Sequence, residues 1–197
     1  MTPENVDRRV RKTRTTLRIC LGKLLRTKRI QDISVKELAD MADINRGTFY
    51  LHYRDVYDLL SHIESEVLKQ FSELLEQYAL PSLSDDPKPL LCELFRLIRD
   101  NADLTECLIG PNGDIHFLNR LRAIFNEKVI TPWLQTLNLE GTVDYSYWFA
   151  FISEGFIGII KLWLENDASV PPEEMADKCV SMIRAGFRAF TAPPEST

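Results

Sequence analysis

The sequence lacks the cysteine pattern and the leader that mark secreted or metal-binding proteins. Its four cysteines are Cys20, Cys92, Cys107 and Cys179. Without a C-x-x-C pair they support neither a zinc site nor a thioredoxin-like site. Thiols scattered in this way fit a reducing compartment. The first residues are charged and no apolar run of the secretory type follows them, so we expect a cytoplasmic protein.

Long uninterrupted hydrophobic runs are also absent. The most apolar stretch, 147–164, contains Glu154 and Lys161, whereas a membrane-spanning helix needs about 20 mostly apolar residues. We interpret this stretch as a buried helix of a soluble protein, and we expect no membrane partner.

Catalytic motifs are missing too. No Walker loop, dinucleotide-binding glycine motif, nucleophile elbow or H-E-x-x-H motif occurs. His52, His62 and His116 are not at metal-ligand spacing. The sequence therefore predicts no enzyme, no catalytic residue, no cofactor and no metal, although an active site assembled from distant residues leaves no such motif.

Charge is unevenly distributed along the chain. The 197 residues are 45% hydrophobic and 27% charged, as in an ordinary globular protein, and the net charge is −5. Residues 1–54 nevertheless hold 13 lysines and arginines against 6 aspartates and glutamates, a net charge of +7, and the other 143 residues have a net charge of −12. Such asymmetry indicates one end that binds nucleic acid or another charged surface.

Helical spacing dominates the sequence. Glycine and proline gather at a few breaks, and the segments between them repeat apolar residues every three to four positions. No β-alternation bounded by hairpin signals is present. We predict an all-α fold of about nine helices. The first, over 7–27, also carries Arg11, Arg14 and Arg18 as a stripe, which is either a solvated face or a basic surface for a partner.

Capping residues then place three further helices. Ser34 and Glu37 form a capping box at the start of a second helix, which stops near Asp43, a residue that tolerates left-handed backbone. Asn45 caps a short third helix over 46–53, and Asp55 caps a fourth that runs to about residue 77. Two short helices joined by a tight turn, behind a basic helix, describe a helix-turn-helix.

The segment S-V-K-E-L-A-D-M-A-D-I-N-R-G-T-F-Y-L-H-Y-R-D-V-Y-D-L-L, residues 34–60, resembles the DNA-binding pattern of the TetR/AcrR family of transcriptional regulators. The resemblance implies a DNA-binding domain over 7–67, with its helix-turn-helix at 34–53, and a ligand-binding and dimerisation domain over 85–191. The implied function is a ligand-responsive repressor. It would bind a palindromic double-stranded operator as a homodimer and respond to a small-molecule effector.

The resemblance also assigns DNA contacts, and small or polar residues at the start of the third helix suit base edges. Two departures stand out: Asp43 where the family often has glycine, and Val56 where it often has lysine, a contact that Arg54 is placed to replace. The expected DNA-binding residues are Ser34, Lys36, Asn45, Arg46, Gly47, Thr48, Tyr50, His52 and Arg54.

The second half gives weaker assignments. Aromatic residues and one cysteine are candidates for an effector pocket, with simple core filling as the alternative: Phe95, Cys107, Phe117, Trp133 and Trp148. Two helical glycines amid aromatic residues suggest close approach of a partner helix, with packing inside one subunit as the alternative. The expected dimer interface comprises Phe151, Gly155, Gly158, Ile159, Leu162, Met182 and Phe187.

Another class of function remains compatible with the sequence. A co-activator or protein-binding module of the same fold would not repress through DNA. Val56, in place of an expected phosphate-binding lysine, favours that alternative, whereas the arginine stripe at Arg11, Arg14 and Arg18 argues against it.

Overall fold

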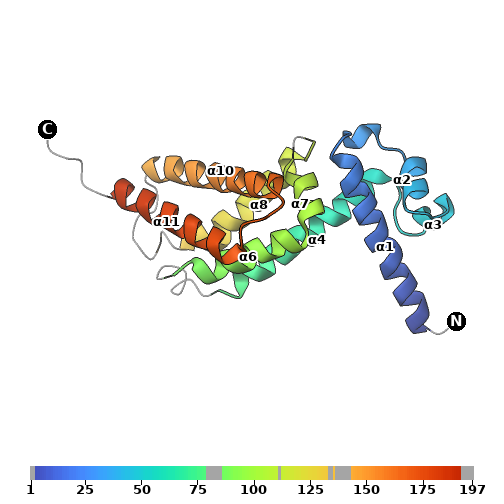
Figure 1. The fold of residues 1–197 in the computed structure, drawn as a ribbon, viewed down its shortest axis with the longest axis horizontal. Helices are drawn as coiled ribbons and strands as arrows, with labels where there is room; N and C mark the ends of the chain where they lie inside the picture. Colours follow the sequence, from blue (N-terminus) through green and yellow to red (C-terminus); the bar gives the residue numbers. More distant parts are fainter. Residues whose placement is uncertain (1–2, 79–85, 111, 133–134, 136–142, 192–197) are drawn as a thin grey trace. The chain divides into compact units, whose positions relative to one another are not determined.

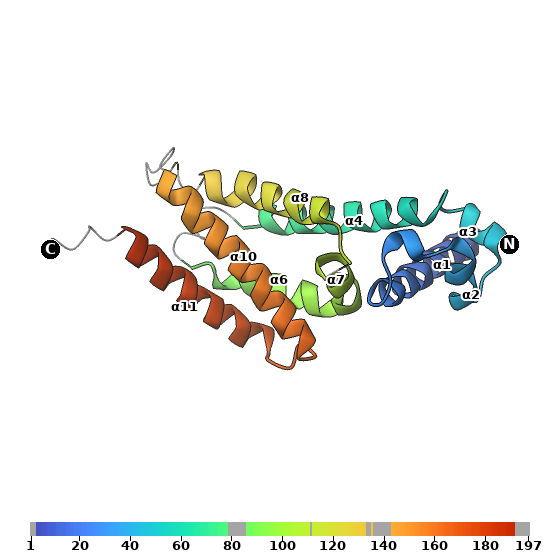
Figure 2. The same cartoon turned by 90° about the horizontal axis from the view of Figure 1, so that it is seen from above.

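The computed structural model describes residues 3–78, 86–110, 112–132, 135 and 143–191. Nine α-helices and no strand occur in these described residues, which confirms the all-α prediction. The chain divides into two compact units (Figures 1 and 2). Unit 1 comprises 1–69 and 101–118, and unit 2 comprises 70–100 and 119–197. The DNA-binding and effector domains expected over 7–67 and 85–191 stay predictions.

Unit 1 is built around the apolar face of α1 (Pro3–Leu25). Leu17 and Leu21 are at most 1% exposed, and Leu38 and Phe49 are fully buried with them in the core of the unit. Leu38 belongs to α2 (Val35–Met41) and Phe49 to α3 (Arg46–Tyr50). These two helices follow a short 3-10 turn over Ile30–Asp32. The first part of α4 (Val56–Glu76) closes this core with the buried Leu59.

The helix boundaries in unit 1 follow the predicted caps. Ser34 Oγ accepts from Glu37 N at 3.1 Å, Asn45 Oδ1 accepts from Gly47 N at 2.9 Å, and Asp55 Oδ1 accepts from Asp58 N at 2.8 Å. Each bond satisfies a backbone N–H that the first turn of a helix leaves without an intrahelical partner. The third helix is shorter than the predicted range 46–53, since α3 ends at Tyr50 and residues 51–53 lie outside it.

Asp43 has the left-handed backbone that the sequence suggested, with φ of 52°. The N–H of Ile44 reaches back to Ala39 O at 3.0 Å, and the N–H of Asp43 reaches Asp40 O at 3.3 Å. These two bonds form a Schellman motif, which usually places glycine at the left-handed position. The turn between α2 and α3 is therefore fixed by backbone hydrogen bonds despite an unfavourable residue.

Unit 1 also includes α7 (Ala102–Ile109), which packs along α1. Gly22 is the point of α1 next to Asp103, and a Cβ there would lie 3.4 Å from Asp103 O. Arg26 pairs with Asp103 at 2.8 Å and with Glu106. Asn112 Nδ2 donates to Leu25 O at 3.0 Å. Contacts far apart in sequence thus attach 101–118 to the first helix.

Unit 2 contains α6 (Lys88–Asp100), the end of α8 (Ile115–Phe125), a π-helical turn at Asn126–Ile130, α10 (Val143–Glu165) and α11 (Pro172–Thr191). Figures 1 and 2 show α11 running beside α6 and α10. The fully buried Phe95 makes edge contacts with Phe156 and Trp163, with ring centroids 5.7 and 5.1 Å apart. The Arg96–Glu173 and Lys88–Asp177 pairs, at 2.5 and 2.7 Å, join α6 to α11.

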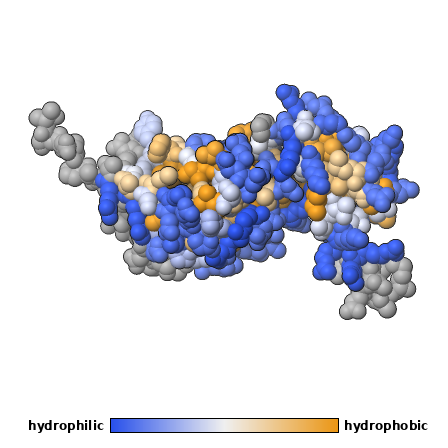
Figure 3. Space-filling model, viewed as in Figure 1, coloured by the Kyte–Doolittle hydropathy of each residue, from blue (hydrophilic) through white to orange (hydrophobic). Residues whose placement is uncertain are grey.

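The prediction that 147–164 is a buried helix is wrong. In the window Ser146–Glu165 only 22% is buried inside the chain, and this helix is long and apolar enough to cross a membrane by length and composition alone. Tyr147 is 73% and Phe151 74% exposed. Figure 3 shows apolar residues gathering over α10. Apolar residues surround this helix on every side, so their pattern could not indicate which side the chain itself covers.

Replacing Asp43 by glycine should stabilise the chain, because glycine has no Cβ penalty at positive φ. We expect Asp43→Gly to raise the free energy of unfolding by up to about 1 kcal/mol, measured by urea denaturation. Asp40→Gly, the same substitution inside α2, should lower it instead. An Asp43→Gly variant that is less stable than the parent would contradict this account of the turn.

Candidate nucleic-acid interface

The short helix α3 has two different faces. Phe49 is fully buried, and its ring meets the Tyr50 ring edge-on at 5.6 Å. Tyr50 itself is 58% exposed, and Arg46 is exposed one turn earlier. Because the buried Phe49 fixes how α3 packs on unit 1, the exposed Arg46 and Tyr50 beside it are held at the surface, available to a partner.

The start of α3 is open to a close approach. Asn45 and Gly47 are exposed, and Thr48 is half-buried. A Cβ at Gly47 would meet only Asn45 Oδ1, at an ordinary distance of 3.5 Å. The packing of this chain therefore does not require glycine at position 47. The absence of a side chain there leaves room for a backbone or a base edge next to α3.

The predicted contacts outside α3 are also at the surface of unit 1. Ser34 and Lys36 are exposed at the start of α2, although Ser34 Oγ is occupied by the cap. Arg54 has an 87% exposed side chain and pairs with Asp58 Oδ1 at 3.0 Å. Val56 is 4% exposed and belongs to the core. Arg54 can offer a phosphate its charge, but it shares that charge with Asp58.

His52 is half-buried beside α1. Burial lowers the pKa of its imidazole, and the nearby positive charge of Arg14 lowers the pKa further. His52 is therefore neutral at pH 7, and it can donate one hydrogen bond to a phosphate oxygen as a neutral ring.

Exposed apolar residues that the sequence motif did not single out flank this surface. Leu51 is 81% exposed directly after α3, Tyr57 is 55% exposed in the first turn of α4, and Met41 is 47% exposed at the end of α2. An apolar side chain can contact the methyl group of thymine. The available signal was the position of Leu51, an apolar residue on the outer side of a helix whose inner side is Phe49.

The predicted pocket residues that lie in the described chain are all buried, but they belong to two units. Phe95 and Trp148 lie in the core of unit 2, and Cys107 and Phe117 lie in the core of unit 1. Burial raises the pKa of Cys107 to about 12, so its thiol stays protonated and unreactive. Trp133 lies outside the described residues. Their assignment to an effector pocket stays a prediction.

Most predicted interface residues are at the surface of unit 2. Phe151 and Leu162 on α10 are 74% and 62% exposed, and Met182 on α11 is 56% exposed. Ile159 is half-buried. A Cβ on either Gly155 or Gly158 would meet nothing within 4 Å. The side chain of Phe187 lies outside the described part. Within the described residues, this face of α10 is therefore exposed.

Comparison with known proteins gives the same family that the sequence motif suggested. A family described as "Transcriptional regulator C-terminal region", of TetR type, matches residues 85–185. The uncharacterized HTH-type transcriptional regulator YxbF of Bacillus subtilis (strain 168) is 21% identical over 168 residues, which cover 81% of this chain. The chain spans 42% of the length of that relative.

Solved structures match nearly end to end. A TetR transcriptional regulator from Streptococcus agalactiae 2603V has a TM-score of 0.60 at 20% identity, covering 92% of this chain and 99% of that one. The regulator FadR from Bacillus subtilis, solved with stearoyl-CoA, has a TM-score of 0.62 at 14% identity, covering 87% and 98%. These neighbours share the fold. With the family match over half of its length, the chain belongs to the TetR family of transcriptional regulators.

Proposed function

We propose that this protein is a repressor that binds a palindromic DNA operator as a homodimer and leaves it when a small molecule binds. The observation that carries the DNA-binding part is the orientation of α3. Phe49 is buried in the core, and Arg46 and Tyr50, which flank it on the helix, are exposed. A recognition helix needs this arrangement in order to present side chains to base edges in the major groove.

The charge distribution supports the same proposal. Residues 1–54 have a net charge of +7 within a chain of net charge −5. Contacts from lysine and arginine to phosphates supply most of the non-specific affinity for DNA, and side chains that reach base edges supply specificity. Arg46 and Tyr50 are the specificity candidates, and Lys36, Arg54 and His52 are the phosphate candidates.

The exposed face of α10 supports the homodimer. Tyr147, Phe151 and Leu162 expose large apolar side chains, and Gly155 and Gly158 leave the helix backbone accessible. Contiguous exposed apolar surface of this kind usually marks an interface. Two-fold symmetry would place two copies of α3 on half-sites about 34–36 Å apart, or a multiple of one helical turn.

For the small-molecule effector, a solved neighbour offers a first class of probe. FadR, a fold neighbour, was solved with stearoyl-CoA, so acyl-CoA thioesters are reasonable first probes. An effector would favour a dimer with a different spacing of the two α3 helices and would release the operator by population shift.

Removing the outer side chains of α3 should abolish specific DNA binding. We expect Arg46→Ala with Tyr50→Ala to weaken binding to the duplex upstream of the protein's own gene by at least about 100-fold, since each base contact contributes about 1–3 kcal/mol. Fluorescence anisotropy at several salt concentrations, against scrambled duplex, measures this loss. Lys178→Ala, which removes an exposed charge from α11, serves as the control and should bind normally. If the parent protein prefers neither the upstream duplex nor a sequence obtained by DNA selection over scrambled duplex, the protein-binding alternative replaces the repressor.

Adding bulk at Gly158 should separate the dimer without unfolding the chain. A Cβ at Gly158 would meet nothing within 4 Å, and leucine is a better helix former than glycine by about 1 kcal/mol. We expect Gly158→Leu to raise the dimer dissociation constant at least about tenfold in analytical ultracentrifugation, while the melting temperature holds or rises at concentrations where the parent is monomeric. Ala123→Leu on α8, also at an exposed position, is the matched control. An unchanged dimer would exclude this face of α10.

An effector should lower operator affinity in a saturable way. We expect at least one compound from a panel of acyl-CoA thioesters and other metabolites to shift the operator titration by about 5–150-fold, the usual range of allosteric coupling. The shift should persist in a variant of the exposed surface such as Lys178→Ala. Operator binding that no compound in a broad panel changes would argue against the ligand switch and leave the DNA-binding part intact.

A further inference from the structure

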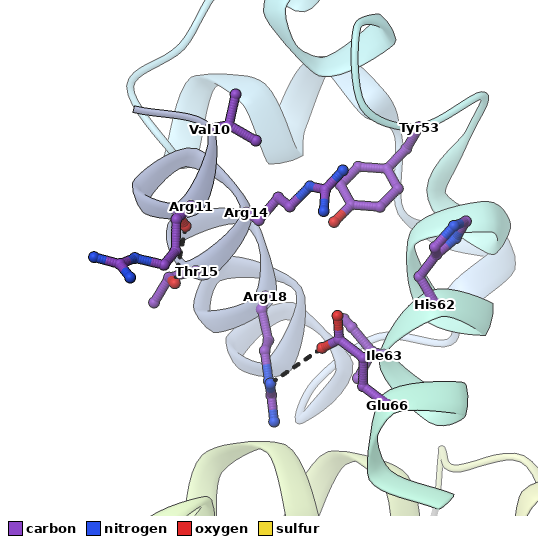
Figure 4. A pocket seen from close by; sticks show the side chains of 9 residues that line it. All are labelled: Val10, Arg11, Arg14, Thr15, Arg18, Tyr53, His62, Ile63 and Glu66. Carbon is purple, nitrogen blue, oxygen red and sulfur yellow. Dashed lines mark hydrogen bonds and ion pairs between the residues drawn. The ribbon is translucent and has the colours of Figure 1, made fainter. Parts of the chain in front are cut away.

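Unit 1 contains a hollow between α1 and α4 to which the proposed function assigns no role. Its volume is about 260 Å³. Figure 4 shows Arg14 and Arg18 extending from α1, and Tyr53, His62 and Glu66 entering from the segment that leads into α4 and from α4 itself. Arg11 is at its rim, with a guanidinium that points away from α4. The arginine stripe found in the sequence is therefore not a flat solvated face, because two of its members line a concavity.

The charges in this hollow are unbalanced. Within the part of the chain that the structure describes, neither Arg11 nor Arg14 has an ion-pair partner. Arg18 is 23% exposed, with Nη1 3.5 Å from Glu66 Oε2 and Nη2 bonded to Asn101 Oδ1 at 3.1 Å. The guanidinium groups of Arg14 and Arg18 thus share one carboxylate, that of Glu66, and Arg11 adds a further positive charge at the rim. That carboxylate is 59% exposed and loosely held, so it can swing into solvent when another anion arrives.

Two ring side chains, Tyr53 and His62, also border the hollow. Tyr53 is 8% exposed, and burial, as the largest cause, raises the pKa of its phenol. Its hydroxyl therefore stays protonated at neutral pH and can donate. His62 lies edge-on to the Tyr53 ring at 5.4 Å, and its Nδ1 donates to Asp58 O at 2.8 Å. In a ring that carries its single proton on Nδ1, Nε2 is an acceptor, so His62 borders the hollow and is not counted among its phosphate donors.

We propose that this hollow binds a phosphate group. Guanidinium groups form short charge-assisted bonds to phosphate oxygens, often in pairs. Arg14 would supply the principal contact, Arg18 would exchange Glu66 for the phosphate, and the Tyr53 hydroxyl would donate to a third oxygen. The volume is slightly below the roughly 300 Å³ lower limit of drug-sized ligand sites, which suits a phosphate with few further atoms. Both the DNA backbone and a small phosphorylated molecule supply this group.

Occupancy would change the contacts that fix α1. Arg18 joins α1 to Glu66 on α4 and to Asn101 before α7. A phosphate on Arg18 would release Glu66 and replace one α1–α4 contact by a bridge through the ligand. The site is thus placed to alter the geometry of unit 1 next to His52 and Tyr53, directly after α3.

The test is an NMR titration of the full chain with inorganic phosphate, without DNA and at constant ionic strength set with chloride. The ring protons of His62 and Tyr53 report the hollow directly. We expect saturable shifts in the parent and at least about tenfold weaker phosphate binding in Arg14→Gln. Lys12→Gln removes a neighbouring charge on α1 that does not line the hollow, and its affinity should stay within about twofold of the parent.

A second variant should act in the opposite direction. Glu66→Gln removes the competing carboxylate, so phosphate should bind several-fold more tightly, on the order of one charge-assisted contact. Asp40→Asn removes an exposed acid from α2 and should have no such effect. Phosphate shifts that do not saturate, or an Arg14→Gln variant that behaves like Lys12→Gln, would overturn the site. A Glu66→Gln variant that behaves like Asp40→Asn would overturn the exchange at Arg18.

Adding duplex DNA to the phosphate-loaded protein identifies the source of the phosphate. If the duplex displaces phosphate from the hollow, a backbone phosphate of DNA is the occupant. If inorganic phosphate titrates the His62 and Tyr53 signals with the same affinity in the DNA complex, the duplex leaves the hollow open and the occupant is a small phosphorylated molecule. Because the first titration contains no DNA, its outcome is independent of whether the chain binds an operator.

Discussion

The burial of Phe49 is the constraint on which the DNA-binding half depends. A helix of five residues has no independent stability in water, because the unfavourable nucleation of its first turn is not repaid by so few hydrogen bonds. Its position is therefore set by its neighbours. Phe49 is fully enclosed, its ring lies 5.6 Å from Tyr50 and 5.9 Å from Tyr53, and the core around it includes Leu17 of α1 and Leu38 of α2. The orientation of Arg46 follows from this packing and not from α3 alone.

The first helix, α1, is likewise held in place by its packing and by polar contacts. Its inner face supplies the core on which α2 and α3 rest, and its later turns are joined to α7 by Gly22, Arg26 and the carbonyl group of Leu25. The outer side of its middle turns is basic. One helix therefore supports the recognition helix, anchors a distant segment and lines the basic hollow, so a change at the hollow acts on a structural element that α3 requires.

How much could be predicted from the sequence depends on the range of the interactions concerned. Caps at Ser34, Asn45 and Asp55 and the left-handed turn at Asp43 involve partners within a few residues, and these features were predicted correctly. The attachment of α7 to α1 brings together residues about 80 positions apart, and no local pattern contains that information. For the same reason Phe95 and Phe117 looked alike in the sequence, although they fill different cores.

The error on α10 has a different origin. Its sequence is apolar on all sides, which fits a helix enclosed by its own chain, a membrane span and a helix enclosed by a second copy equally well. The structure removes the first possibility, since Phe151 and Leu162 are mostly exposed. Glu154, paired with Arg122 of α8, and the half-buried Lys161 lie within the same helix, and charges in the middle of a spanning segment are costly. The exposed apolar side of α10 includes Gly155 and Gly158, where an added Cβ would meet nothing within 4 Å, and the helix also contains an ion-paired residue. Contact with another protein helix explains these features better than contact with lipid does.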